Sequence, residues 1–137
     1  MKIFKCYSLD DTKAVAESFA QSAKPGQCFA LYGNLGFGKT TFSQYLIRAL
    51  NPDIKSISSP TFTLVQSYPS NLCEIFHVDC YRMDSSEEFY ELGLDDSFSS
   101  SITIIEWPEI IEQCLPDSTI KIVFSKNPEY LELRASC

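Results

Sequence analysis

Apolar residues along the chain form short runs of strand length that alternate with stretches of helical spacing. The continuous apolar run 28–32 is typical of a parallel strand that is covered by helices on both faces. After it, apolar residues recur at helical spacing over 42–50, and Asn51-Pro52 predicts the end of that helix. Before it, residues 2–7 predict a strand and residues 8–23 predict a helix. The expected core face of that helix is Thr12, Ala16, Phe19 and Ala23, after a capping box formed by Ser8-Leu9-Asp10-Asp11.

The second half of the chain predicts two hairpins, one strand and two short helices. Residues 61–68 and 73–79 are rich in β-branched and aromatic residues and predict a hairpin with a four-residue loop. A short acidic helix is expected from Ser85 to about Gly93. Residues 102–105 predict a buried strand, and Pro108 predicts the first turn of a helix that reaches about Cys114. The remaining segments, 120–124 and 130–135, predict the second hairpin.

Helices interleaved with buried strands predict an α/β fold with a mixed, mostly parallel sheet that is flanked by helices. No repeat, low-complexity tract or linker divides the sequence. The length of 137 residues is within the range of one domain. We therefore expect a single domain over residues 1–137.

The chain is acidic, with a formal net charge of −7 and a pI near 4.6. Nucleic-acid binding needs a basic surface, because lysine and arginine must displace counterions from the phosphates. The charge therefore argues against a protein that binds nucleic acid on its own. Any link to RNA would have to pass through a partner.

The cysteines are scattered and form no C-x-x-C pair, and the chain has one histidine, so we predict no zinc site. The first residues lack the apolar stretch of a signal peptide, and no apolar run approaches the ~20 residues that span a bilayer. We therefore expect a cytoplasmic protein, outside the membrane, with reduced thiols. The cysteines are Cys6, Cys28, Cys73, Cys80, Cys114 and Cys137.

A P-loop motif, G-x-x-x-x-G-K-[ST], lies between the predicted strand 28–32 and the helix that follows. In this motif the glycines let successive backbone N–H groups point at phosphate oxygens, at the positive end of the helix. Lys39 would contact the β- and γ-phosphates and the hydroxyl of Thr40 would bind Mg²⁺. The alternative is a plain strand-to-helix turn whose glycines only permit positive φ. The motif consists of Gly33, Asn34, Leu35, Gly36, Phe37, Gly38, Lys39 and Thr40.

A magnesium site of this type also needs a carboxylate at the end of a buried strand. Two residues satisfy that condition, Asp79 at the end of 75–79 and Glu106 after 102–105. Either could instead be a helix cap or a turn residue. Their spacing alone does not rank them.

Four other features are candidates for function. Ser58–Phe62 lies where P-loop enzymes place a switch segment, although a plain loop held by Pro60 is the alternative. His77 would by default be a buried structural histidine. Arg82 could pair with phosphate or with nearby acids. An acidic stretch is either a solvated face or a docking surface for a basic partner; it contains Asp84, Glu87, Glu88, Glu91, Asp95 and Asp96.

Taken together, these motifs resemble one family, the bacterial tRNA threonylcarbamoyladenosine biosynthesis ATPases called TsaE or YjeE. The resemblance covers nearly the whole chain, and the combination of H-x-D-x-Y-R with E-W is its most specific part. The matching stretches are residues 33–42 including Thr41, Ser59-Pro60-Thr61-Phe62, His77-Val78-Asp79-Cys80-Tyr81-Arg82, Glu91-Leu92-Gly93-Leu94 and Glu106-Trp107-Pro108-Glu109.

The resemblance implies roles for individual residues. Thr40 and Glu106 would hold Mg²⁺, Asp79 would position or activate the attacking water, and Thr61 would sense the γ-phosphate. Trp107 would shape the site or contact a partner, and the same role is expected of His77, Tyr81 and Arg82. The segment Asp10-Asp11-Thr12 resembles the adenine-side edge of the family. Two residues depart from the common pattern, since Asn34 replaces an aspartate and Phe37 replaces a small residue.

The resemblance also implies a cellular role that uses ATP and releases ADP. Hydrolysis would support transfer of a threonylcarbamoyl group to N6 of adenosine 37 in tRNAs that read ANN codons. The protein would dock on a TsaD–TsaB complex and reset it, so that tRNA is bound only indirectly.

Two alternatives share the nucleotide site. A small-molecule or nucleotide kinase would need a lid and an acceptor pocket, for which 137 residues leave little room. An ATP-sensing scaffold would use nucleotide only to tune partner binding. A GTPase would need N-K-x-D and D-x-x-G segments, which the sequence lacks.

Overall fold

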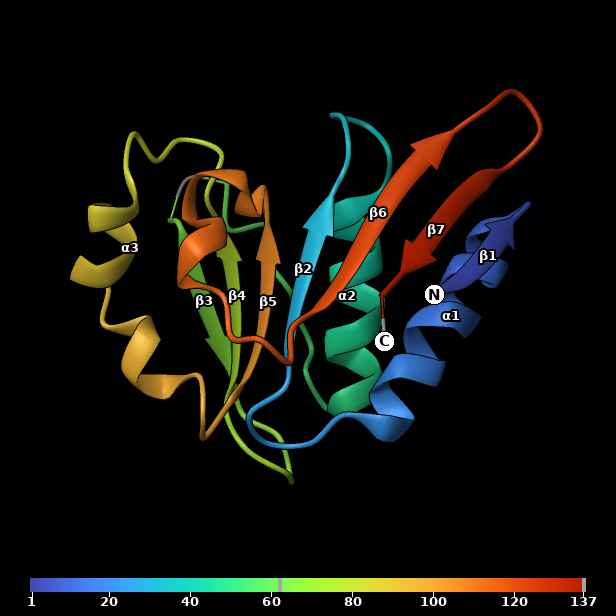
Figure 1. Cartoon of the computed structure of the whole chain (residues 1–137). Coiled ribbons are helices and arrows are strands. Elements are labelled where there is room, and N and C mark those ends of the chain that lie inside the picture. Colours follow the sequence, from blue (N-terminus) through green and yellow to red (C-terminus); the bar gives the residue numbers. More distant parts are fainter. Residues whose placement is uncertain (62, 137) are drawn as a thin grey trace.

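The computed structural model describes residues 1–61 and 63–136, which form a seven-stranded mixed sheet with helices on both faces (Figure 1). The predicted α/β class is therefore confirmed. The strands are β1 (Lys2–Cys6), β2 (Cys28–Tyr32), β3 (Val65–Tyr68), β4 (Ile75–Asp79), β5 (Ile102–Glu106), β6 (Ile120–Lys126) and β7 (Leu131–Ala135). The helices are α1 (Leu9–Ser22), α2 (Lys39–Leu50) and α3 (Ser86–Glu91), with 3₁₀ helices η1 (Leu94–Ser97) and η2 (Pro108–Cys114).

The strand order is β1-β7-β6-β2-β5-β4-β3. The central strands β6, β2, β5 and β4 pair in parallel, while β3 and β7 run the opposite way as partners in hairpins. β1 pairs antiparallel with β7 and so shares the direction of the central strands. Five of the seven strands thus run in one direction, as the sequence predicted. Their carboxyl ends form one edge, where ligands of α/β proteins usually bind.

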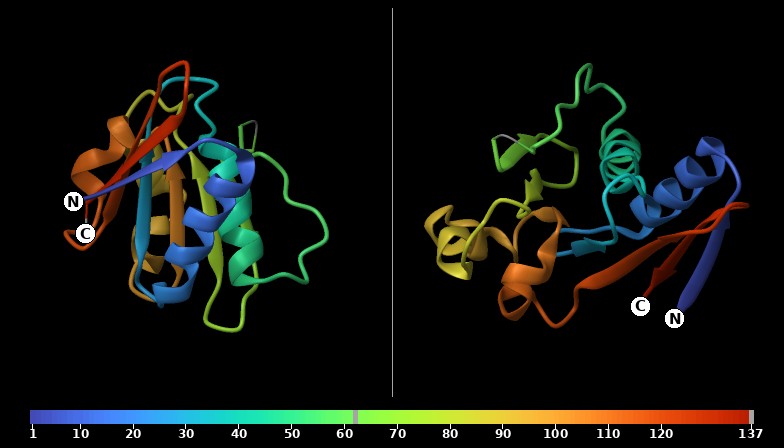
Figure 2. Two further views of the ribbon diagram at one scale, coloured as in Figure 1. Left: turned by 90° about the vertical axis from the view of Figure 1, so that its right-hand side faces the viewer. Right: turned by 90° about the horizontal axis from the view of Figure 1, so that it is seen from above.

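Two hydrophobic clusters cover the two faces of the sheet. α1 and α2 pack on one face, and η2 lies on the other (Figure 2). Neighbouring residues of a strand point to opposite faces, so Cys28 and Phe29 contribute to different clusters, as do Ile104 and Ile105. The continuous apolar runs in β2 and β5 follow from this two-sided burial.

Several predicted boundaries are wrong for local reasons. The first hairpin has a six-residue connection, 69–74, because the Ser70 hydroxyl bonds the backbone N–H and carbonyl of Cys73. Its first strand begins at Val65, since Leu64 forms a turn with φ 69° and donates to the carbonyl of Pro60. The residues before it are not part of the strand, and Phe62 lies outside the described residues.

The helix predictions also need two corrections. Ser8 accepts from the N–H of Asp11, but the Asp11 carboxylate accepts from Tyr7 rather than from Ser8, so the expected capping box is only half formed. The segment after Pro108 is a 3₁₀ helix, and its Ile111 has non-helical angles. The 3₁₀ helix η1 was not predicted.

The described cysteines are free thiols, and Cys137 lies outside the described residues. Burial raises the pKa of Cys28 and of Cys80 to about 12. These two thiols are therefore protonated at neutral pH, which makes them poor nucleophiles and metal ligands.

The burial of strand β5 leads to a prediction about the free energy of unfolding. Ile104 is fully buried, so Ile104→Val is expected to lower the free energy of unfolding by about 1 kcal/mol, from lost burial and incomplete relaxation around the missing methylene. The same substitution at Ile3, which is 52% exposed on edge strand β1, is expected to have little effect. Urea denaturation checks both values, and equal losses would show that burial in β5 does not determine the cost.

Candidate functional site

The P-loop connects the end of β2 to α2, as predicted. Gly36 and Gly38 have φ of 80° and 90°, in the left-handed region that favours glycine. A Cβ on Gly33 would lie 2.9 Å from both the Cβ and the carbonyl oxygen of Phe124, so only glycine permits this approach of β6. α2 then begins at Lys39, where its unpaired N–H groups and positive dipole end favour an anion.

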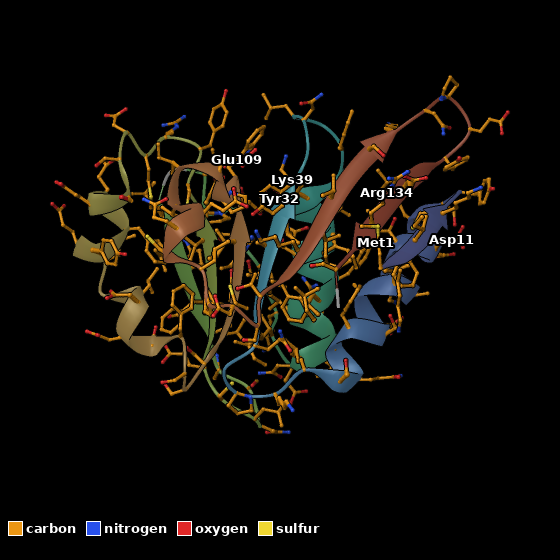
Figure 3. The ribbon with its side chains drawn as sticks, viewed as in Figure 1. Met1, Asp11, Tyr32, Lys39, Glu109 and Arg134 are labelled. Carbon is orange, nitrogen blue, oxygen red and sulfur yellow. The ribbon has the colours of Figure 1, made fainter. Side chains whose placement is uncertain are left out.

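A cleft of about 260 Å³ opens at this loop. Figure 3 shows Lys39 at the upper end of β2 and α2, at the carboxyl edge of the sheet. The motif therefore meets Glu106, the last residue of β5, and the following Trp107 in one cleft. The lining residues are Asn34, Leu35, Gly36, Phe37, Gly38, Lys39, Thr40, Thr41, Glu106 and Trp107.

The ammonium group of Lys39 is buried among loop carbonyls and an aromatic ring. Its Nζ donates to the carbonyls of Gly33 and Asn34, at 3.2 Å for Asn34, and lies 3.7 Å from the centroid of the Trp107 ring. Burial lowers the pKa of Lys39, while the charge of Glu106 acts in the opposite direction. A phosphate in the cleft would supply the negative charge that this partly desolvated cation lacks.

The two candidate carboxylates lie side by side. β4 and β5 pair in parallel with Asp79 opposite Glu106, so both acids leave the sheet at the same edge. Glu106 is 2% exposed; its Oε1 accepts from the hydroxyl of Thr40 at 2.7 Å and its Oε2 lies 2.5 Å from Nε2 of His77. Glu106 is thus the acid that contacts the motif directly.

Asp79 faces the segment that precedes β3. Its Oδ2 accepts from the hydroxyl of Thr61 at 3.5 Å, and its Oδ1 accepts from the backbone N–H of Tyr81 at 2.9 Å. Burial raises the pKa of Asp79, and the neighbouring charge of Glu106 adds to this shift. Ser59 lies 2.7 Å from Thr61 through their hydroxyls, so two residues of the predicted switch segment are connected to this acid.

Trp107 has an unusual backbone conformation that directs its ring over the loop. Its φ and ψ of 56° place it in the left-handed region between β5 and Pro108, which is strained for a bulky residue. The indole covers Lys39 on one side and contacts the ring of Tyr81, with centroids 4.8 Å apart. Tyr81 is 53% exposed, so the aromatic pair extends from the cleft to the surface.

Two of the predicted residues lie away from this cleft. Asp11 is well separated from Lys39 in Figure 3, and its carboxylate caps the turn before α1. Arg82 is exposed and does not line the cleft. The remaining predicted residues surround the P-loop, directly or through Glu106 and Asp79.

A second groove, of about 370 Å³, continues from the P-loop towards β1 and the β6–β7 hairpin. Thr12 lines it together with Gly36, Phe37, Gly38 and Thr41, while its role at the adenine side of the site stays a prediction. The hairpin turn 126–131 forms the other wall; the sequence predicted this hairpin but not its place beside the P-loop. No local pattern indicates that place, because it follows from the pairing of β6 with β2.

The donor set suits magnesium and a nucleotide. The Thr40 and Glu106 oxygens lie 2.7 Å apart, close to the ~3 Å between adjacent oxygen ligands of Mg²⁺ at about 2.1 Å. The described ranges contain no cluster of three His, Cys, Asp or Glu that could hold a metal ion. Mg²⁺ needs few protein ligands, since it usually keeps waters and binds substrate phosphates.

Similarity to known proteins identifies the family of this chain. The sequence profile of a family described as threonylcarbamoyl adenosine biosynthesis protein TsaE matches residues 6–134. The chain belongs to the TsaE family. A TsaE protein of Rickettsia bellii is 44% identical over 84% of this chain and 80% of its own length. One of Bacillus subtilis is 37% identical over 85% of this chain and 73% of its own length.

A solved structure agrees with the TsaE assignment. The crystal structure of Bacillus subtilis YdiB has a TM-score of 0.79 and 32% identity, covering 96% of this chain and 82% of that chain. This likeness confirms the predicted fold independently of the motifs. None of the helices in the described part of this TsaE chain has the length and apolar character to cross a bilayer.

The two departures in the P-loop of this TsaE protein are accommodated by the structure. Phe37 is partly buried and packs against the cluster beneath α1 and α2. Asn34 is exposed, and its backbone carbonyl accepts from Lys39 and from the N–H of Phe37. The loop thus uses the backbone of residue 34, which a change of side chain leaves in place.

Proposed function

We propose that the chain is a magnesium-dependent ATPase that converts ATP to ADP and phosphate. The observation that carries this proposal is the meeting of Lys39, Thr40, Glu106 and Asp79 at one edge of the sheet, beside a loop of left-handed glycines. A plain strand-to-helix turn would not need a buried lysine next to two buried acids.

The residues divide the work of hydrolysis. The loop N–H groups and Lys39 bind the phosphates, which requires the ammonium group to exchange its carbonyl partners for phosphate oxygens. Thr40 and Glu106 would hold Mg²⁺, which neutralises charge on the phosphates. Asp79 accepts a hydrogen bond from the attacking water and orients it towards the γ-phosphorus. The oxygen of that water bonds to phosphorus as the bond to the β-phosphate oxygen breaks, and its proton leaves towards solvent or phosphate.

Asp79→Asn separates catalysis from stability. The pKa of the folded-state carboxyl is raised, so between the ordinary aspartate value of 3.8 and that raised value the folded protein binds more protons, and its stability falls as pH rises. The asparagine variant lacks this loss, so its unfolding free energy at pH 7 is expected to equal or exceed that of the parent. Its hydrolysis should fall at least about 10-fold.

Thermal denaturation at pH 7 and near pH 4, with phosphate release at pH 7, checks this variant. The stability advantage should shrink towards the lower pH, because the folded-state carboxyl of Asp79 becomes protonated and then, like asparagine, carries no charge. An asparagine variant that is less stable at pH 7, or equally active, would contradict the assigned role of Asp79.

We infer that this hydrolysis supports formation of N6-threonylcarbamoyladenosine at position 37 of tRNAs that read ANN codons, in the cytoplasm. The family assignment supports the pathway, and the docking partner would be a TsaD–TsaB complex that the ATPase resets between turnovers. α3 and η1 present exposed acids, including Glu87, Glu91, Asp95 and Asp96, which suit a basic protein surface. The net charge of −7 favours tRNA being held by the partner.

Depletion of the protein in its host, followed by nucleoside analysis of bulk tRNA, tests the pathway. Threonylcarbamoyladenosine should fall and return when the parent chain is re-expressed, but not with Asp79→Asn. An unchanged nucleoside level after depletion would exclude this role. Phosphate transfer from ATP to a metabolite instead of water would favour a kinase.

A further inference from the structure

His77 is fully buried in β4, two residues before Asp79, and its imidazole contacts the other acid of the site. Its Nε2 lies 2.5 Å from Oε2 of Glu106, while its Nδ1 has no hydrogen-bond partner in the part of the chain that the structure describes. A carboxylate only accepts hydrogen bonds, so Nε2 carries the hydrogen of this contact. Among the described residues, the imidazole of His77 thus forms its side-chain hydrogen bond with Glu106.

We propose that His77 is a positioning residue that fixes the carboxylate of Glu106 so that Oε1 faces Thr40 and the metal position. This inference rests on the proposed ATPase site and assigns a role to a residue that does not itself reach the cleft.

The geometry gives Glu106 two separate supports. His77 holds Oε2 from within the sheet, and Thr40 contacts Oε1 from the first turn of α2. The parallel register pairs Asp79 with Glu106 and His77 with Ile104, so His77 lies one side-chain position behind the carboxyl edge on the same face. With both oxygens engaged, the carboxylate plane is fixed, whereas Thr40 alone would leave the three torsions of the glutamate free to change.

A merely structural histidine would be arranged differently. Burying an imidazole whose second nitrogen lacks a partner costs stability, and an apolar side chain of similar size would avoid that cost. Among the residues that the structure describes, the hydrogen bond of the His77 imidazole goes to the acid that contacts the P-loop threonine. Outer residues that orient a metal-binding carboxylate typically change metal affinity by 10- to 100-fold when replaced.

Magnesium-coupled binding of ADP measures this role without depending on turnover. The dissociation constant of ADP is determined by calorimetry with EDTA and again with MgCl₂. The ratio of the EDTA value to the MgCl₂ value reports how strongly the metal improves ADP binding. His77→Leu removes the donor at similar volume and is expected to lower that ratio at least about 10-fold, with little change in EDTA. His77→Gln, whose amide reaches the position of Nε2, should stay within about threefold of the parent.

Thr103→Val is the matched control on the neighbouring strand. Thr103 is 1% exposed, its hydroxyl has no partner among the described residues, and it points to the opposite face from Glu106. This variant should keep the parent ratio. A folded His77→Leu protein with the parent ratio would overturn the inference and leave His77 as a core residue.

A second comparison serves if His77→Leu does not fold. His77→Asn keeps a polar group at the position of Nδ1 but cannot reach Glu106, so it should lose the magnesium effect that His77→Gln retains. Equal ratios in these two variants would overturn the inference. If the parent chain itself binds no ADP in either condition, the proposed ATPase fails instead, so the two failures are distinguishable.

Discussion

Replacing Lys39 by alanine is expected to raise the dissociation constants of ATP and ADP at least about 100-fold, because it removes an ammonium group from the lining of the P-loop cleft. Truncating one member of a buried, hydrogen-bonded charge pair costs about 2–5 kcal/mol, and ~2.7 kcal/mol corresponds to 100-fold. Lys39 is 5% exposed and burial lowers its pKa, so its charge is poorly solvated until phosphate arrives. Isothermal titration with each nucleotide in MgCl₂ measures the change.

Lys24→Ala provides the matched control, because Lys24 is exposed just after α1 and does not line the cleft. It should bind both nucleotides like the parent. Circular dichroism should show the same fold for both variants, since Lys39 contacts loop carbonyls and Trp107 rather than the hydrophobic clusters. A Lys39→Ala protein that binds nucleotide normally would contradict the phosphate site itself.

The parts that the sequence predicted well are those with local signals. The strand, glycine loop and helix around Lys39 follow from an apolar run, a fixed motif and helical spacing in adjacent segments. The two strand-end acids were also identified, because a buried strand that ends in a carboxylate is visible in the sequence. Their adjacency needed the structure, since only the parallel pairing of β4 with β5 places Asp79 opposite Glu106.

Other features depend on contacts between distant segments, which no local pattern encodes. The groove wall formed by the β6–β7 turn exists because β6 pairs with β2, about 90 residues away in sequence. The strained backbone of Trp107 and its ring over Lys39 depend on the turn between β5 and η2. His77 shows the same limit: family resemblance placed it among the site-shaping residues, its own sequence context suggested a structural histidine, and only the neighbouring strand reveals its carboxylate partner.

The wrong boundaries have a common physical origin. β-propensity extended the first hairpin to residues 61 and 73, but local hydrogen bonds compete with the ladder at both places. The Ser70 hydroxyl hydrogen-bonds with the backbone N–H and carbonyl of Cys73. The N–H of Leu64 donates to the carbonyl of Pro60 within a turn. That turn also brings Thr61 to Asp79, so the shortened strand allows the contact with the proposed water-orienting acid.

Glu106→Gln is expected to lower the rate of magnesium-dependent hydrolysis about 100- to 1000-fold while ADP binding in EDTA stays within a few-fold of the parent. The amide has nearly the same shape but lacks the negative charge that magnesium binding requires, and metal stabilisation of phosphate charge contributes several kcal/mol to such reactions. In the parent, Thr40 and His77 contact the two carboxylate oxygens of Glu106. The fold of the variant should persist, because the glutamine amide can still hydrogen-bond with both side chains. Steady-state phosphate release over a magnesium titration gives the rate, and calorimetry gives the affinity.

Glu109→Gln is the matched control for this charge change. Glu109 is an exposed acid three residues further along the chain, at the start of η2, and it does not line the P-loop cleft. Because it has no contact with Thr40 or His77, its variant should hydrolyse ATP at close to the parent rate. Equal losses in the two variants would mean that general negative charge near the loop, and not a carboxylate at the metal position, supports hydrolysis. Undiminished hydrolysis in Glu106→Gln would remove Glu106 from the metal site and leave Asp79 as the candidate.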